Sequence, residues 1–161
     1  CALPIFDNRI TGMTGHQENP GTGYTLKGEP ANIMDIETIV RALGVTRIRT
    51  VNPLKLDEMK EALDWAYQEV REAPVVLITR WPCVLKKLST EDRREFRIAP
   101  GQCTVNHEKC IGCKKCLQTG CPALSFDKYE RKVSIDRMQC VGCTVCAQVC
   151  PVKAIVKGAR K

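Results

Sequence analysis

The sequence has few aromatic residues and no long hydrophobic run. Phe, Trp and Tyr make up 5% of its 161 residues, beside 43% hydrophobic and 27% charged residues, which is the balance of a globular chain. No apolar stretch approaches the roughly 18 residues that a membrane-spanning helix needs, and no signal-peptide pattern opens the chain. We therefore expect a cytoplasmic protein with no membrane association.

Two shorter absences also matter. The chain opens on Cys1 without an initiator methionine, which leads us to expect either cleavage or a part of a longer polypeptide. The segment PGTGYTLKG contains glycines and a lysine but lacks the Gly-Lys-Ser/Thr ending of a phosphate-binding P-loop. We interpret that segment as a loop only.

Cysteine, by contrast, is abundant, and most of it lies in a repeat near the end of the chain. EKCIGCKKCLQTGCPALSF is followed 30 residues later by MQCVGCTVCAQVCPVKAIV, and the strand-like patterns QCTV and KVSI precede the two copies. Each copy has a cysteine at every third position and then a Cys-Pro. An internal repeat of this kind predicts pseudo-twofold symmetry.

The spacing of these cysteines favours two iron–sulfur clusters. The runs C-x2-C-x2-C-x4-C-P and C-x2-C-x2-C-x3-C-P match the two-cluster ferredoxin pattern, in which the fourth cysteine of each run ligates the other cluster. The expected ligand sets therefore cross between the copies. They are Cys110, Cys113, Cys116 and Cys150 for one [4Fe–4S] cluster, and Cys140, Cys143, Cys146 and Cys121 for the second.

Other interpretations of the cysteines are weaker but remain open. Zinc favours two separated cysteine pairs, and disulfides are disfavoured in the cytosol. Gly112 and Gly142 are expected to let each loop turn and to aim backbone N–H groups at the cluster sulfides. The three cysteines outside the pattern are interpreted as ordinary thiols; they are Cys1, Cys83 and Cys103.

The formal net charge of +7 arises entirely in residues 99–161, since residues 1–98 hold equal numbers of basic and acidic side chains. Such a basic tail could indicate nucleic-acid binding. Two oxidised clusters with their thiolates would leave roughly +3, so we expect no nucleic acid as a partner. Nearby lysines would partly offset the cluster charge, on a solvated face or on one that attracts an acidic electron carrier. They are Lys114, Lys115, Lys153 and Lys157.

The first half of the chain alternates between strand and helix patterns, which predicts an α/β domain with a parallel sheet. The expected strands are 2–6, 46–51 and 74–78, and the expected helices are 35–44 and 56–72. Asp35 suits a helix N-cap and Gly44 a helix end. We expect this partial α/β domain to occupy residues 1–85, a charged linker 86–102, and a small α+β ferredoxin-like domain 103–161.

The order of motifs along essentially all of the chain resembles one known family. The motifs are DNRITGMTGHQ, PGTG, GEPA, DIETIVRALGV, RWPCVL and the double cysteine repeat. In this order they resemble the C-terminal end of the alpha subunit in the indolepyruvate ferredoxin oxidoreductase family. That family belongs to the thiamine-diphosphate-dependent 2-oxoacid:ferredoxin oxidoreductases.

The resemblance implies a cofactor role for the DN loop near the start of the chain. Thiamine-diphosphate enzymes bind a divalent ion through a motif that opens with Gly-Asp and closes with an Asn side chain and a nearby carbonyl. Carried over, Asn8 and the carbonyl of Ile10 would bind Mg²⁺, a cation that prefers oxygen ligands. His16 and Gln17 would line the pocket, or would only satisfy loop backbone. The Gly-Asp half is absent, so the site is incomplete in this chain.

The resemblance also implies a reaction and its partners. It is the oxidative decarboxylation of aryl 2-oxoacids of the indolepyruvate type with coenzyme A, with electrons passing through two clusters to ferredoxin. A second, smaller subunit would complete the enzyme, and this chain alone would be inactive. The alternatives are a stand-alone two-cluster electron carrier with residues 1–85 as a docking domain, and a regulatory iron–sulfur switch that binds nucleic acid.

Overall fold

A computed structural model describes residues 1–158. The chain forms two compact units, Cys1–Arg97 and Ile98–Lys161. The first unit has an α/β architecture and the second is a small α+β unit, as the sequence predicts. Among the residues described, no helix is both long and apolar enough to cross a membrane.

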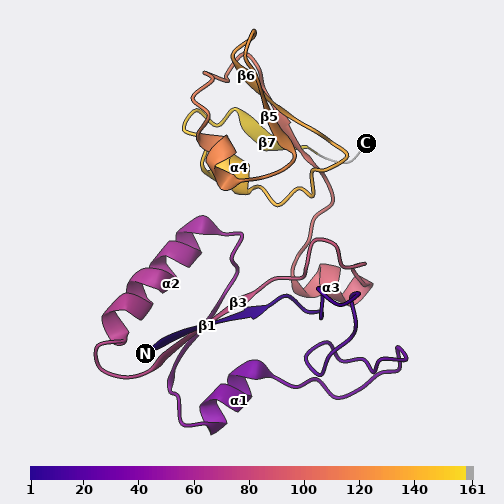
Figure 1. Cartoon of the computed structure of the whole chain (residues 1–161), viewed down its shortest axis with the longest axis vertical. Helices are drawn as coiled ribbons and strands as arrows, with labels where there is room; N and C mark the ends of the chain where they lie inside the picture. Colours follow the sequence, from indigo (N-terminus) through magenta and orange to yellow (C-terminus); the bar gives the residue numbers. More distant parts are fainter. Residues whose placement is uncertain (159–161) are drawn as a thin grey trace. The chain divides into compact units, whose positions relative to one another are not determined.

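The first unit is built on a three-stranded parallel sheet, shown in Figure 1. Its strands are β1 (Ala2–Asp7), β2 (Arg47–Val51) and β3 (Val75–Arg80). The strand order is β1-β3-β2, so the last strand in sequence is central. The first five residues of β3 are buried because helices cover both faces of the sheet at its centre.

Two helices connect these strands and lie on opposite faces of the sheet (Figure 1). They are α1 (Ile36–Ala42) and α2 (Leu56–Glu69). Val40 of α1 packs with Val76 and Ile78, whereas Ala62 of α2 packs with Leu77. Alternate residues of a strand point to opposite faces, so the single apolar strand β3 supplies both halves of the core.

Helix α1 begins and ends as its sequence predicts. The Asp35 carboxylate accepts the Thr38 N–H at 2.9 Å, which caps the first turn. Gly44 follows the helix with φ +87°, a left-handed conformation that glycine adopts without steric cost. The Asp35 cap and Gly44 both lie next to α1. Local interactions therefore determine where this helix begins and ends.

Helix α2 buries a different stripe from the one expected from its large side chains. Its buried residues are Ala62 and Ala66, with Met59 packed beside them. Leu63, which the periodicity places on the core face, is 51% exposed. The 3.6-residue period of this segment puts Leu56, Met59, Leu63, Ala66 and Val70 on one face, and the structure keeps Met59 and Ala66 of this face in the contact but not Leu63. Two alanines four residues apart share one helix face and let the helix approach the sheet closely, so small residues displace the leucine from the contact.

The segment 86–102, which its charge predicts to be a linker, contains ordered structure. Helix α3 (Thr90–Glu95) starts at a capping box in which Ser89 and Asp92 exchange hydrogen bonds. The Phe96 ring lies edge-on to Trp81 with centroids 5.6 Å apart. The first unit therefore extends to Arg97. A short helix of charged residues gives no apolar period, which is why its sequence resembles a linker.

The second unit consists of two antiparallel strand pairs and two short helical turns. Its strands are β4 (Cys103–Val105), β5 (Leu124–Asp127), β6 (Lys132–Ile135) and β7 (Ile155–Lys157), and its helical turns are η1 (Lys115–Thr119) and α4 (Val145–Gln148). Strand β4 pairs with β7, and β5 pairs with β6.

The sequence repeat is visible in this second unit. Strands β4 and β6 lead into the two cysteine runs, at the patterns QCTV and KVSI. Each helical turn follows a left-handed residue, Lys114 with φ 62° or Thr144 with φ 66°. Cysteines make up much of the buried core, and they lie among small aliphatic side chains. The repeat therefore builds two similar cysteine environments.

Candidate functional site

Asn8 lies in the loop that follows β1, at the carboxyl end of the parallel sheet. Ligands of open α/β folds bind at this edge. The exposed Asn8 side chain accepts the Ile10 N–H at its Oδ1 over 3.2 Å, which forms a local turn. An amide oxygen has two acceptor sites, so one remains for a cation. The Ile10 side chain is buried and anchors the turn.

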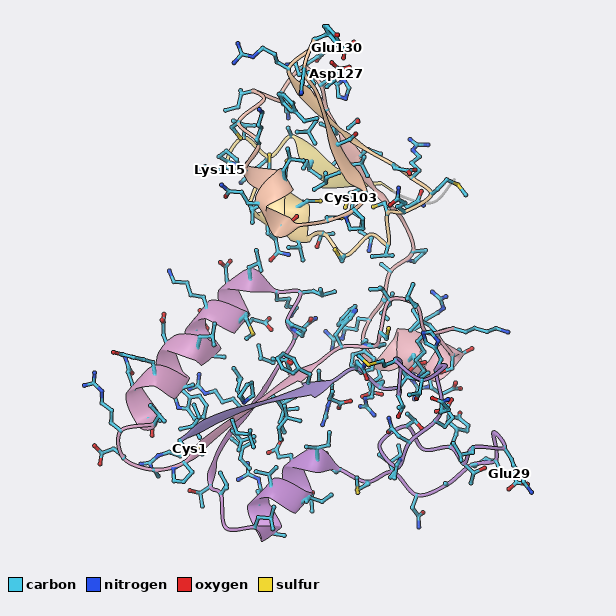
Figure 2. The ribbon with its side chains drawn as sticks, viewed as in Figure 1. Cys1, Glu29, Cys103, Lys115, Asp127 and Glu130 are labelled. Carbon is cyan, nitrogen blue, oxygen red and sulfur yellow. The ribbon has the colours of Figure 1, made fainter. Side chains whose placement is uncertain are left out.

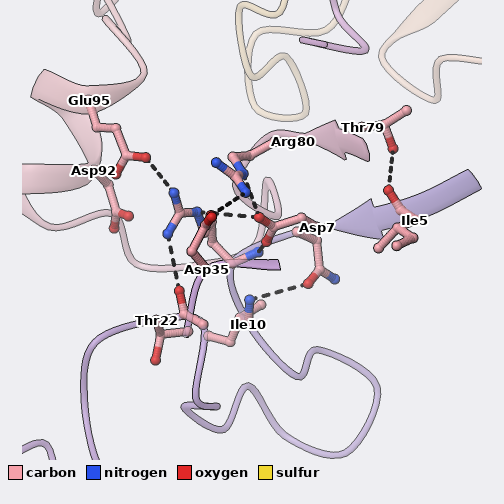
Figure 3. A network of polar contacts seen from close by, with 12 residues as sticks. Ile5, Asp7, Ile10, Thr22, Asp35, Thr79, Arg80, Asp92 and Glu95 are labelled. Atoms are coloured by element: carbon pink, nitrogen blue, oxygen red, sulfur yellow. Dashed lines mark hydrogen bonds and ion pairs between the residues drawn. The ribbon is translucent and has the colours of Figure 1, made fainter. Parts of the chain in front are cut away.

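Ion pairs at the same edge of the sheet hold this loop in place (Figure 3). Asp7 and Arg80 are register partners at the ends of β1 and β3, and Arg80 Nε donates to Asp7 Oδ2 over 2.7 Å. Arg80 also lies 3.6 Å from the carboxylate of Asp35, the N-cap of α1. The side chains of Asp7 and Arg80 are only 10% and 22% exposed, so water screens their attraction weakly.

Arg9 connects the loop to more distant segments. Its backbone N–H donates to Asp7 Oδ1 at 3.2 Å, and its guanidinium donates to the Gly21 carbonyl at 3.1 Å and to Glu95 of α3. The guanidinium also lies 5.4 Å from the centre of the Phe96 ring. The backbone of Arg9 is left-handed, with φ 56°. Contacts from three sequence segments thus stabilise the strained residue next to Asn8.

His16 and Gln17 are exposed at the far end of the same loop. Gln17 and Thr11 exchange backbone hydrogen bonds of 3.0 and 3.2 Å, which close the loop. The Gln17 side chain is engaged by Thr14, whose hydroxyl donates to Gln17 Oε1 at 2.7 Å. The contacts of Gln17 are therefore local to the loop, and the neighbouring residue His16 is exposed.

Two buried polar atoms in this region have no hydrogen-bond partner. Among the described residues, they are Arg9 Nε and Glu18 Oε2. Arg9 Nε still lies 3.7 Å from the Asp7 carboxylate in an ion pair, so Glu18 Oε2 is the atom that leaves room for a further group, because buried polar groups are nearly always satisfied. Both atoms lie in the loop that carries Asn8. The donor chemistry of this loop therefore fits part of a polar ligand site.

In the second unit, the four cysteines of the first expected set line one cavity. They are Cys110, Cys113, Cys116 and Cys150. The cavity has about 330 Å³ of empty space, part of it open to solvent, and its other walls are largely aliphatic. Cys150 belongs to the second sequence copy, so the fold brings it beside the first run, as crossed ligation requires.

The second expected set gathers around a fifth cysteine. Cys146 lies close to Cys143 and to Cys121 of the first copy. The Cys103 backbone N–H donates to Cys140 Sγ at 3.4 Å, and the Cys103 side chain is 1% exposed. Cys103 was interpreted from the sequence as an ordinary thiol, and the structure places it against the second cysteine set. Its isolated position in sequence offers no signal of this contact.

Burial and mutual repulsion oppose thiolate formation at several of these cysteines. Burial raises the pKa of Cys146 to about 12, with further contributions from Cys103 and Cys143. Burial also raises the pKa of Cys116, and neighbouring cysteines add to it. A bound cation reverses this balance, because metal ligation displaces the thiol protons. Such crowding of thiols is costly unless a positively charged metal core holds them together.

Cys110 behaves differently because hydrogen-bond donors surround it. Burial alone would raise its pKa, but the N–H groups of Val133 and Gly112 and the ammonium of Lys132 outweigh burial and lower it. These donors stabilise a negative sulfur. The same donors would stabilise a thiolate that ligates a metal cluster.

The glycine of each run makes a close backbone approach. A Cβ on Gly112 would lie 2.3 Å from the Arg131 carbonyl oxygen, and one on Gly142 would lie 2.0 Å from the Gly101 carbonyl oxygen. Both glycines have positive φ, +66° and +70°. Each cysteine loop therefore lies so close to a neighbouring segment that only glycine, which has no Cβ, fits at this position.

The arrangement of sulfurs suits a cluster better than a single ion. Within residues 1–158, no three His, Cys, Asp or Glu side chains converge on a point where one metal ion could bind. Zinc needs four ligands at bonding distance from one centre, whereas an iron–sulfur cluster needs thiolates spread around a wider body. Thiolates around an apolar cavity are the donor set that iron–sulfur clusters use. The residues present therefore fit two clusters.

Comparison with protein families agrees with the two units. Residues 103–157 match the 4Fe-4S dicluster domain family. Residues 3–79 match the C-terminal thiamine pyrophosphate (TPP) binding domain of thiamine pyrophosphate enzymes. These matches confirm the expected fold classes and cofactor types of the two units. The individual ligand residues remain predictions.

Relatives match almost the whole chain. An indolepyruvate oxidoreductase subunit IorA from Archaeoglobus fulgidus is 44% identical over 154 residues, 95% of this chain and 23% of that protein. The subunit of the same name from Pyrococcus horikoshii is 40% identical over 156 residues, 96% of this chain and 23% of that protein. A pyruvate synthase subunit PorD from Methanothermobacter marburgensis is 43% identical over 51 residues, 32% of this chain and 58% of that protein. The chain thus spans about a quarter of the length of the IorA relatives.

Proposed function

This chain belongs to the thiamine-diphosphate-dependent 2-oxoacid:ferredoxin oxidoreductases, and we propose that it forms part of an enzyme that oxidatively decarboxylates aryl 2-oxoacids such as indolepyruvate. Coenzyme A takes up the acyl group and carbon dioxide is released. The two electrons pass through two [4Fe–4S] clusters to ferredoxin. The relatives named for indolepyruvate support this substrate class.

The observation that carries the proposal is the cavity lined by Cys110, Cys113, Cys116 and Cys150. It combines two sequence copies in one all-sulfur site, which suits one-electron transfer. The first cluster is assigned to these four residues. The second is assigned to Cys140, Cys143, Cys146 and Cys121; Cys103 lies beside the first three, and Cys121 lies near Cys146.

In the first unit, Asn8 and the carbonyl of Ile10 are assigned to the divalent ion that holds the cofactor diphosphate. The free acceptor site on Asn8 Oδ1 and its place at the carboxyl end of β1 support this role. When bound, thiamine diphosphate supplies the carbanion chemistry of decarboxylation. The turn between Asn8 and Ile10, beside the Asp7–Arg80 pair, would hold these ligands in place for the cation. His16 and Gln17 are assigned to the rim of this pocket.

The partners follow from this assignment. We place the protein in the cytoplasm, with ferredoxin as electron acceptor and a second, smaller subunit that completes the enzyme. The similarity to PorD, a subunit of pyruvate synthase, supports a role within a multisubunit oxidoreductase. Nucleic acid and membranes have no part in the proposed reaction.

The test uses the complete natural protein, purified without oxygen together with its partner subunit. Iron, sulfide and thiamine diphosphate are counted, and reduction of ferredoxin by indolepyruvate, phenylpyruvate and pyruvate is compared in the presence of coenzyme A. The expected result is two clusters, bound thiamine diphosphate and preference for the aryl substrates. Two clusters without thiamine diphosphate would overturn the proposal and favour a simple electron carrier.

A further inference from the structure

Cys103 is a buried thiol held against the second cysteine set. It is the first residue of β4, where Figure 2 labels it, and the residue is 1% exposed. Its backbone N–H donates to Cys140 Sγ at 3.4 Å, and the Thr144 N–H donates to its sulfur. Its side chain and that of Cys146 belong to the same buried core cluster. Two ligand residues of the proposed second cluster thus contact Cys103.

The repeat supplies an internal comparison for this residue. A shift of 30 residues maps Cys103 onto Val133, which occupies β6 and is 2% exposed. Val133 lines the cavity of the first cysteine set, and its N–H donates to Cys110 as the Cys103 N–H donates to Cys140. The backbones therefore act alike at the two sites. Only the second site has a side chain at this position that can donate a hydrogen bond.

We propose that the Cys103 thiol donates a hydrogen bond to a sulfur of the second cluster, whose ligating thiolates have no proton of their own to give, and makes that cluster easier to reduce than it would be with valine at this position. A hydrogen bond to a cluster sulfur stabilises the more negative, reduced state. Cys103 is thus a positioning residue that makes two otherwise similar sites unequal. This inference rests on the two-cluster assignment of the proposed function.

Charged groups also distinguish the two sites. Lys114 lines the first cavity, and its ammonium lies 4.3 Å from the centre of the Phe126 ring. A nearby cation also favours reduction. The effect of the side chain at this position is therefore measured as the change in one cluster's reduction potential between the natural protein and the variant at that site. The potentials of the two clusters are not compared with each other.

The test exchanges the two equivalent side chains in the complete, cluster-loaded protein. Cys103→Val and Val133→Cys are matched swaps of similar volume, and Cys103→Ser keeps a donor at the second site. Each protein is titrated with dithionite through redox mediators, and the one-electron reduction of the clusters is followed by electron paramagnetic resonance. Iron and sulfide are counted in parallel.

Cys103→Val is expected to lower the equilibrium constant for reduction of one cluster by about threefold to tenfold, which is roughly 30 to 60 mV for a one-electron couple. Val133→Cys should raise the constant for the other cluster, and Cys103→Ser should stay near the natural value. Full iron with unchanged potentials in Cys103→Val, or a serine variant that behaves like valine, would refute the hydrogen bond and leave the two-cluster function intact. Loss of iron in Cys103→Val would instead make Cys103 a ligand and overturn the ligand assignment.

Discussion

Asp7 and Arg80 lie opposite each other at the carboxyl ends of β1 and β3, and Arg80 Nε donates to Asp7 Oδ2 over 2.7 Å. Arg9, which follows Asn8 in the chain, also bonds to Asp7 through its backbone N–H. One carboxylate therefore supports both the sheet edge and the loop that carries Asn8. The candidate cation site depends on this ionic contact.

Asp7→Asn should lower the free energy of unfolding of the first unit by about 2 kcal/mol, because it removes the charge that pairs with two little-exposed arginines, Arg9 and Arg80. Chemical denaturation of the complete protein measures the change. Glu37→Gln is the control, since Glu37 pairs with Arg41 on an exposed helix surface and such pairs contribute about 0.5 kcal/mol or less. Equal losses of unfolding free energy in both variants would show that the Asp7 ion pairs stabilise the protein no more than the exposed Glu37–Arg41 pair does.

Asn8→Ala should weaken binding of Mg²⁺ and thiamine diphosphate by at least about tenfold, because a cation loses an oxygen ligand, and should leave the iron content unchanged. Isothermal titration of the complete enzyme measures the affinity. Asn52→Ala is a matched control, since Asn52 Oδ1 also accepts a backbone N–H two residues on, at 2.9 Å, after β2. Unchanged cofactor affinity in Asn8→Ala would remove Asn8 from the site.

Cys150→Ala should remove the cluster bound by the run 110–116, even though Cys150 belongs to the other sequence copy. The iron content should fall by about half, and the remaining spectroscopic signal should be that of the other cluster. Cys1→Ala, outside the repeat, should keep all the iron. Crossed ligation is wrong if Cys150→Ala removes the cluster of the run 140–146 instead.

Gly142→Ala should prevent stable assembly of the second unit, because its new Cβ would lie 2.0 Å from the Gly101 carbonyl oxygen. We expect a loss of more than about 3 kcal/mol in stability, beyond the 1–2 kcal/mol of left-handed strain alone. Gly120→Ala separates the two effects, since Gly120 has nearly the same φ, +67°, and open space around it. Thermal denaturation and iron content of both variants provide the comparison, and similar behaviour would refute the packing argument.

Helix α3 should loosen in acid because of Asp92. Burial alone would raise the pKa of this carboxyl, but hydrogen bonds from Lys86 and Ser89 lower it below 3.8. A carboxylate with a lowered pKa stabilises the fold above its unfolded pKa, and that stability is lost as the pH falls below about 4.

Asp92→Asn should remove this acid dependence and cost about 1–2 kcal/mol at neutral pH, because the capping box and the Lys86 pair are lost. Proteolysis near α3 as a function of pH measures the effect. Asp64→Asn, on the exposed face of α2, should keep the natural acid profile. If proteolysis near α3 still increases in acid in Asp92→Asn, groups other than Asp92 cause the loosening of α3.

Several features were predictable because their causes lie close together in sequence. The Asp35 cap and the apolar run of β3 each predicted the element that the structure contains, and the spacing of the two cysteine runs predicted the dicluster domain family that residues 103–157 match. Period, capping and ligand spacing act over a few residues, so the order of residues already carries the information. The role of the DN loop came from the resemblance to a known family, and its ligand residues stay predictions.

Other features required the fold, because they join residues that are distant along the chain. The Arg9–Glu95 contact, the ordered α3 segment and the Ala62 contact of α2 depend on which surfaces meet. Cys103 is the clearest example, since nothing beside it in sequence relates it to Cys146. The sequence alone determined which atoms could bind metal clusters and a cofactor cation. Only the tertiary structure decided which side chains surround those atoms. Packing brings distant strands together, and local sequence patterns carry no information about which strands meet.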